Sequence, residues 1–170
     1  MNRSYTSIIL TFLILIPLQA LVFRNFVVFG TGFCFIYLLC LLMLPIEIST
    51  ITGMVIGLLS GLFLDLFYHT LGIHAAAAVL FMFLRAFWLK ANAPRSGYEL
   101  NALPTIPNYG FLWFLGYSLP LILFYSIAIF IIEAGSLDFI GLSLIKGLIT
   151  ALISLIFIVF TQYFFFKPAK

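Results

Sequence analysis

The stretch GMVIGLLSGLFLD, residues 53–65, decides the fold because it places a small or acidic residue at every fourth position of an apolar run. The marked positions are Gly53, Gly57, Gly61 and Asp65. Residues four apart lie on one face of an α-helix, and glycines on such a face let a second helix approach closely inside a bilayer. The stretch therefore predicts a membrane-spanning helix with one face adapted to protein contact.

The composition of the whole chain is that of a membrane domain. Hydrophobic residues make up 65% of the 170 positions and charged residues only 8%, whereas a soluble domain has roughly half and a quarter. This length accommodates about six spans of about 20 residues and no separate soluble domain. We therefore expect an all-α integral membrane protein, folded as one compact bundle over residues 1–170.

Apolar segments along the chain predict where the spans lie. The expected spans are 7–23, 31–44, 50–67, 72–89, 110–132 and 139–166, and the one long loop covers 90–109. Pro94, Pro104 and Pro107 prevent a long helix in that loop. The first two spans are short for a bilayer.

Basic residues near the span ends predict the orientation. One side would carry Arg3, Arg85, Lys90, Arg95, Lys167 and Lys170, and the other Arg24 and Lys146. Cytoplasmic segments carry the excess of lysine and arginine. We therefore expect both termini and the 90–109 loop in the cytoplasm, and Asp65, His74 and Lys146 near the outer surface.

Asp65 needs an explanation because an ionisable group inside a membrane costs about 3 kcal/mol or more unless it is paired, hydrated or protonated. A structural ion pair with Lys146 is one hypothesis, since the two residues are expected at similar depths. In the alternative, Lys146 reaches outward alone and Asp65 faces water or the start of a neighbouring helix. His69 and His74 flank the following turn, but their spacing is not that of a zinc helix.

The glycine face also has two interpretations. It could pack against another helix of the same bundle, or it could accept the transmembrane helix of a partner protein. In the second case, Gly57→Leu or Gly61→Leu would weaken partner binding without unfolding the bundle. A weaker seam of small residues lies in the last span and consists of Ser143, Gly147, Ala151 and Ser154.

Several function classes find no support in the sequence. It has no nucleophile elbow, phosphate loop, zinc motif or dinucleotide fingerprint, so we expect no enzymatic activity, no catalytic residues, no metal and no cofactor. The basic residues are scattered and never cluster, so we expect membrane lipid and no nucleic acid as a partner.

The segment GLLSGLFLDLF (57–67), followed by LGIHA (71–75), resembles the signature of the rod shape-determining MreD family. In that family a glycine-rich third span leads to an aspartate, and a Leu-Gly pair then opens an alanine-rich fourth span. The similarity in residues covers about 53–78, while length and span number fit the whole chain.

The resemblance implies a multi-pass protein of the bacterial inner membrane that belongs to the cell-elongation (rod) complex. Members of the family bind MreC, a single-span coiled-coil protein. Through MreC they connect cytoplasmic MreB filaments to RodA and penicillin-binding protein 2, and so help to position peptidoglycan synthesis. Their fold is similar to that of the substrate-binding subunits of energy-coupling-factor vitamin transporters.

Two other classes stay open at this point. The first is a substrate-binding subunit of a vitamin-type transporter, supported by the outer polar residues Asp65, His69, His74, Glu133 and Lys146 and by the fold analogy. The second is an intramembrane enzyme acting on a lipid-linked substrate, which would need paired acids or histidines on facing helices. Asp65 with Glu133 is the obvious pair for such chemistry.

Overall fold

The computed structural model describes residues 3–28, 30–95, 97–99 and 103–165. Within these ranges the chain is helical, apart from loops and one isolated bridge between Val28 and Gly32. The helices are α1 (Arg3–Leu21), α2 (Leu38–Leu42), α3 (Thr50–Tyr68), α4 (Ile73–Ala91), α5 (Ile106–Tyr109), α6 (Phe111–Ala134) and α7 (Ile140–Phe165), with 3-10 turns at Phe23–Asn25 and Leu137–Phe139. The predicted end of the last span at residue 166, and the basic residues Lys167 and Lys170, lie outside the described residues.

Four of these helices, α3, α4, α6 and α7, are long and apolar enough to cross a membrane. Helix α1 contributes a shorter apolar stretch, Thr6–Leu21. The expectation of an all-α, multi-pass membrane protein is confirmed at this level. Between α4 and α6, the described residues contain one helical element, the short helix α5.

The second predicted span, 31–44, is wrong as a helix. Only Leu38–Leu42 is α-helical, and the rest of the segment consists of turns and extended chain. The segment is nevertheless deeply buried, since Cys34 to Leu44 are all at most 4% exposed. Its apolar composition therefore reflects a place at the centre of the protein rather than a lipid-facing helix.

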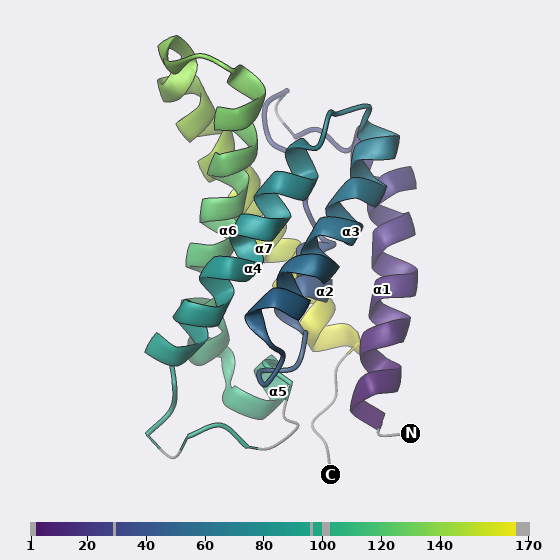
Figure 1. Cartoon of the computed structure of the whole chain (residues 1–170), viewed down its shortest axis with the longest axis vertical. Helices are drawn as coiled ribbons and strands as arrows, with labels where there is room; N and C mark the ends of the chain where they lie inside the picture. The colour runs from purple at the N-terminus through teal and green to yellow at the C-terminus, as the bar shows by residue number, and fades with distance from the viewer. Residues whose placement is uncertain (1–2, 29, 96, 100–102, 166–170) are drawn as a thin grey trace.

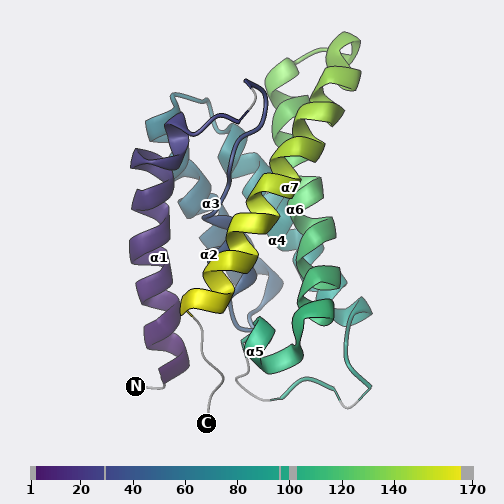
Figure 2. The same cartoon turned by 180° about the vertical axis from the view of Figure 1, so that it is seen from behind.

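The chain runs back and forth along one direction, as Figures 1 and 2 show. Helix α1 runs away from the end where the chain begins, and the segment 33–44 returns through the middle of the bundle. Helices α3 and α4 form one closely packed pair, and α6 and α7 form another. The start of α1, the end of α7 and the loop after α4 all lie at the same end of the molecule (Figure 1).

The ends of α3 and α4 are set by local chemistry. Ser49 caps α3, because its hydroxyl accepts a hydrogen bond from the Thr52 backbone N–H at 3.1 Å. At the other end, His69 adopts a left-handed conformation with φ 55° and ends the helix. Gly72 follows with φ 83° and begins α4, a conformation that favours glycine. This requirement explains the glycine at position 72.

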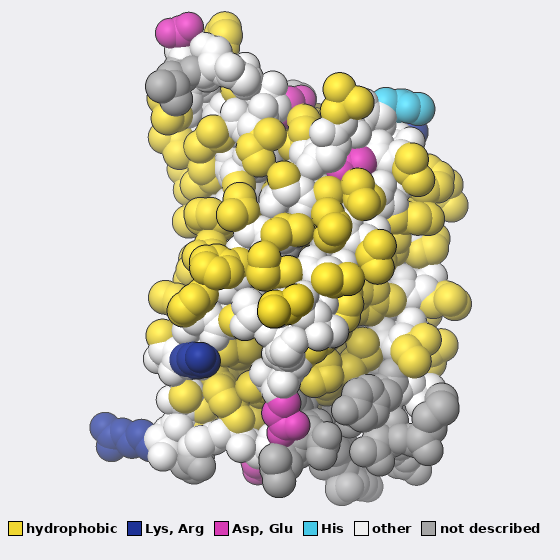
Figure 3. Space-filling model, viewed as in Figure 1, with side chains coloured by type: hydrophobic (Ala, Val, Ile, Leu, Met, Phe, Trp, Pro, Cys, Tyr) yellow, Lys and Arg dark blue, Asp and Glu magenta, His cyan; other side chains and the backbone are white. Residues whose placement is uncertain are grey.

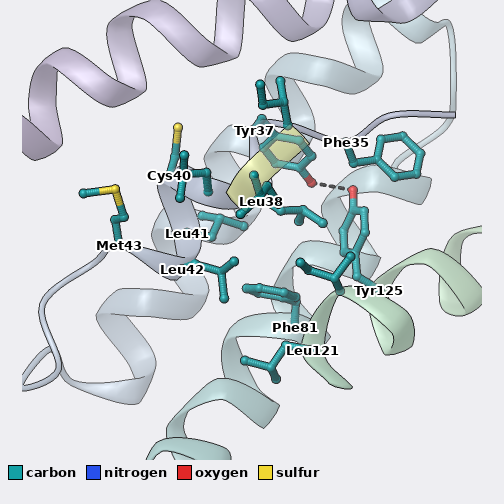
Figure 4. Packing of buried hydrophobic residues seen from close by; sticks show 14 of the residues in the cluster. Phe35, Tyr37, Leu38, Cys40, Leu41, Leu42, Met43, Phe81, Leu121 and Tyr125 are labelled. Atoms are coloured by element: carbon teal, nitrogen blue, oxygen red, sulfur yellow. Dashed lines mark hydrogen bonds between the residues drawn. The ribbon is translucent and has the colours of Figure 1, made fainter. Parts of the chain in front are cut away.

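The core forms where residues 33–44, the central segment, meet α4 and α6. In Figure 4 side chains of α2 point toward Phe81 of α4 and Leu121 and Tyr125 of α6. Phe35 and Tyr37 make edge-on ring contacts with Tyr125 at 5.5 and 5.9 Å between centroids. The central segment is thus enclosed by helices and does not face lipid.

The surface carries a broad hydrophobic belt with charged side chains mostly toward the two ends (Figure 3). Large apolar side chains of the long helices are strongly exposed, such as Leu59 at 62%, Leu66 at 74% and Leu112 at 81%. A soluble monomer rarely exposes so much contiguous apolar surface. The belt is the surface that a bilayer would cover.

Candidate functional site

The glycine face of α3 packs directly on α4. Gly53, Gly57 and Gly61 are all buried. A Cβ atom added to Gly57 or Gly61 would collide with the backbone of α4, and one added to Gly53 would meet the end of the Met82 side chain. At Gly61 the added Cβ would lie 2.5 Å from the Ala75 Cα and 2.7 Å from the His74 carbonyl oxygen. Glycine is required here because the two backbones are in contact.

This packing corrects the docking hypothesis for the glycine face. Helix α4 of the same chain already occupies the face, so a partner's helix has no access to it in this structure. The internal-packing interpretation agrees with the structure. The seam on α7 is similarly occupied, because a Cβ on Gly147 would lie 2.9 Å from the Ile127 Cα of α6.

Asp65 joins the end of α3 to the start of α4. It is 6% exposed, and its two carboxylate oxygens accept hydrogen bonds from the backbone N–H groups of His74 and Ala75, both at 3.0 Å. The Thr70 hydroxyl donates a further bond to the same carboxylate. Backbone N–H groups in the first turn of a helix lack partners within that helix, and its dipole favours a negative charge.

The ion pair with Lys146 does not form. The carboxylate of Asp65 is bound by the start of α4, which is the alternative that the sequence left open. Lys146 is half-buried, and its ammonium nitrogen lies 5.9 Å from the centroid of the Phe130 ring. The two residues belong to different contacts at the same end of the bundle, because a helix start offers Asp65 two donors without desolvating a second charge.

His74 begins a short chain of polar side chains that leads into the core. Its Nδ1 lies 3.1 Å from the Tyr125 hydroxyl, which in turn hydrogen-bonds to the hydroxyl of Tyr37. The ring of Tyr68 also lies 4.7 Å from the His74 ring between centroids. His74 therefore connects the Asp65 turn to the central segment and has a structural position in the bundle.

Side chains of four surrounding helices form hydrogen bonds with the backbone of the central segment. The Gln19 amide of α1 donates to the Cys34 carbonyl at 2.9 Å. On α7, Thr150 and Ser154 accept from the backbone N–H groups of Phe33 and Phe35. The opposite end is held by α4 and α6: Arg85 donates to the carbonyls of Leu42 and Leu44, and Tyr117 donates to Leu42.

These side chains explain how an irregular segment can exist at membrane depth. Backbone groups without partners cost several kcal/mol in lipid, so non-helical backbone is tolerated there only when protein satisfies it. Gln19, Tyr117 and Thr150 were not singled out from the sequence, and Ser154 was noted only as a small residue of the α7 seam. Their common signal is a polar residue within an otherwise apolar span.

We predict that Ser154→Ala lowers the free energy of unfolding by about 1–3 kcal/mol, because it leaves the buried Phe35 N–H without its acceptor. The bond it removes is 2.8 Å long, and Ser154 is fully buried. Denaturation of the purified protein in mixed micelles measures the change.

Ser118→Ala is the matched control for this variant. Ser118 is also fully buried, but its hydroxyl has no hydrogen-bond partner among the described residues. Its removal should leave stability unchanged or slightly higher. Equal losses in the two variants would show that the Ser154 hydroxyl does not support the central segment.

Apolar grooves run along α1. One of about 630 Å³ lies between α1 and α3 and is lined by Phe12, Pro17, Ile56, Leu59 and Phe63 among others. A second of about 310 Å³ lies on the α7 side of α1 and includes Leu15 and Thr161. Within the described part of the chain, no three His, Cys, Asp or Glu side chains gather closely enough to hold a metal ion.

Comparison with known proteins adds no assignment. No family model, no curated protein and no solved structure matches this chain.

Proposed function

We propose that this protein is a non-catalytic membrane subunit of the bacterial cell-elongation complex, related to MreD. In this role it sits in the inner membrane with both termini in the cytoplasm, and it binds MreC. Through MreC it connects to MreB, RodA and penicillin-binding protein 2. Its contribution is to position peptidoglycan synthesis.

The observation that carries this proposal is that the residues of the MreD-like motif form one structural unit. Gly57 and Gly61 let α3 touch α4, Gly72 makes the turn, and Asp65 binds the start of α4. A motif that builds a rigid helix pair suits a scaffold. The Asp65 carboxylate is committed to three donors, which favours a structural role over acid–base chemistry.

Because α4 covers the glycine face, the proposed partner helix needs another surface. We place it in the groove between α1 and α3, which is almost wholly apolar and opens toward the bilayer. Leu59 and Phe63 of α3 are 62% and 40% exposed there. A single apolar helix is the occupant whose chemistry fits, because close van der Waals packing drives helix association in lipid.

We expect Leu59→Trp to abolish or strongly reduce co-purification of a single-span coiled-coil protein, because the larger ring fills the α1–α3 groove. Leu112→Trp is the control, since Leu112 is an exposed leucine of α6 outside that groove. Pull-down from the native host membrane, with the unfolding free energy of each variant alongside, measures the effect. Equal recovery of the partner by both variants would remove the groove from this role.

The rival function, a vitamin-binding transport subunit, would use a pocket at the Asp65 end of the bundle. This pocket is lined by Phe35, Tyr68, Thr70, His74 and Glu133 among others, and its volume is about 150 Å³. Pockets for small organic ligands typically measure about 300–1,000 Å³. The smaller volume favours the scaffold over the transport subunit.

A further inference from the structure

A small pocket with both apolar and polar lining residues lies at the opposite end of the bundle from Asp65, where α3 begins and α4 ends. It has a volume of about 160 Å³ and is lined by the turn before α3, by the last turns of α4 and by Tyr98. Ser49 and Thr50 contribute hydroxyl groups, and Arg85 and Lys90 contribute positive charges. No acidic side chain is among its described lining residues.

Arg85 gives this pocket its chemistry. The side chain is only 2% exposed, and a guanidinium stays charged in proteins. Its hydrogen bonds go to the Tyr117 hydroxyl from Nε, and to the carbonyls of Leu42 and Leu44 from Nη2. None of these bonds uses Nη1, and Arg85 is one of the residues that line the pocket.

Among the described residues, the oxygens that accept from Arg85 are all neutral, so they form hydrogen bonds without cancelling its charge. A buried charge is costly unless an opposite charge accompanies it. Arg85 and Lys90 are the charged residues among the described lining of the pocket. Burial raises the pKa of Tyr98 to about 12, so this hydroxyl adds no negative charge at neutral pH.

Three features of the pocket favour an anion. Arg85 lines the pocket, and a guanidinium carries paired donors that suit phosphate and carboxylate oxygens. Lys90 is exposed at the rim and adds a second positive charge. The pocket also adjoins the positive end of the α3 dipole. We propose that this pocket binds a phosphate group, and that the phosphate belongs to the headgroup of an anionic membrane lipid.

Position favours a lipid as the source of the phosphate. Arg85 lies six residues before the end of α4 at Ala91, which corresponds to about 9 Å along the helix. Headgroup phosphates lie just beyond the ends of membrane spans. A lipid lying beside α3 and α4 can therefore place its phosphate in the pocket while its acyl chains stay in the hydrophobic belt.

The test uses the full chain in neutral detergent and native mass spectrometry, with phosphatidylglycerol as the probe. Diacylglycerol, which lacks the phosphate, is the lipid control, and inorganic phosphate is the free anion. We expect bound phosphatidylglycerol, displacement by excess inorganic phosphate, and little bound diacylglycerol. Equal binding of the two lipids would overturn the proposal. Binding of inorganic phosphate as tight as that of phosphatidylglycerol would overturn the lipid as the source and retain the anion site.

Variants localise the binding without disturbing the bonds of Arg85 to the central segment. Ala86→Leu fills the pocket from α4, because Ala86 is part of its lining, and should weaken phosphatidylglycerol binding about tenfold or more, the loss expected for one charged hydrogen bond. Lys90→Gln should weaken binding to a smaller extent. Lys146→Gln removes a lysine at the other end of the bundle and should change nothing. Native affinity in Ala86→Leu, or equal losses in the two lysine variants, would contradict the assignment.

Discussion

Gly61→Leu is expected to disrupt the bundle and to lower the free energy of unfolding by about 3 kcal/mol or more. The first added carbon alone would lie 2.5 Å from the Ala75 Cα and 2.6 Å from the Ala75 nitrogen. Overpacking usually costs about 1–3 kcal/mol when side chains can shift, but the atoms here belong to the backbone of α4. Denaturation in mixed micelles, together with the yield of monodisperse protein, measures the loss.

Gly116→Leu is the control for this prediction. Gly116 lies on α6, and a Cβ there would meet only the Asn92 Oδ1 atom, at 4.0 Å. This variant should keep near-native stability. If Gly61→Leu instead folds as well as Gly116→Leu and loses only partner binding, the glycine face belongs to an interface and the packing described here is wrong.

Asp65→Ala is expected to lower the free energy of unfolding by about 3 kcal/mol. It removes the acceptor for the His74 and Ala75 N–H groups and for the Thr70 hydroxyl, and hydrogen bonds to a charged group contribute about 1.5–3 kcal/mol. The α4 alanines next to Gly61 would then lose their anchor at the turn. Denaturation measures the change, and faster amide hydrogen exchange at the start of α4 should accompany it.

Lys146→Ala separates this explanation from an Asp65–Lys146 ion pair. With the observed contacts, the lysine variant should be nearly neutral, because the ammonium group lies over the Phe130 ring and not against the Asp65 carboxylate. Asp138→Ala is a second control, since that aspartate is exposed and accepts a bond from its neighbour Ser136. Equal losses in Asp65→Ala and Lys146→Ala, not increased in the double variant, would restore the ion pair.

Much of the helical layout could be predicted from the sequence because it depends on local patterns. The glycine spacing predicts α3, and Gly72 followed by alanines predicts α4. The segment 31–44 shows the limit of such patterns. An apolar run of this length is equally compatible with a helix and with an irregular segment buried in protein. As a helix, its 14 residues would reach about 21 Å, less than the roughly 30 Å of a bilayer core.

The contacts of the candidate site were harder to predict because they join distant parts of the chain. The position of Asp65 alone indicates that its burial is energetically costly. Its partner, however, is the backbone N–H of His74, nine residues later, rather than a distant lysine. Gln19, Thr150 and Ser154 form hydrogen bonds with the central segment because the fold brings their helices next to it. One sequence contains no signal for which helix such a side chain will face.

Native mass spectrometry of the tagged protein, gently extracted from its own host membrane, tests the central claim most directly. The scaffold function predicts a stoichiometric complex with a single-span coiled-coil protein, which Leu59→Trp removes and Leu112→Trp preserves. Bound phospholipid is compatible with that result, because the phosphate pocket lies outside the partner groove. A water-soluble, vitamin-sized molecule bound in the absence of any protein partner would contradict the scaffold function and favour the transport subunit.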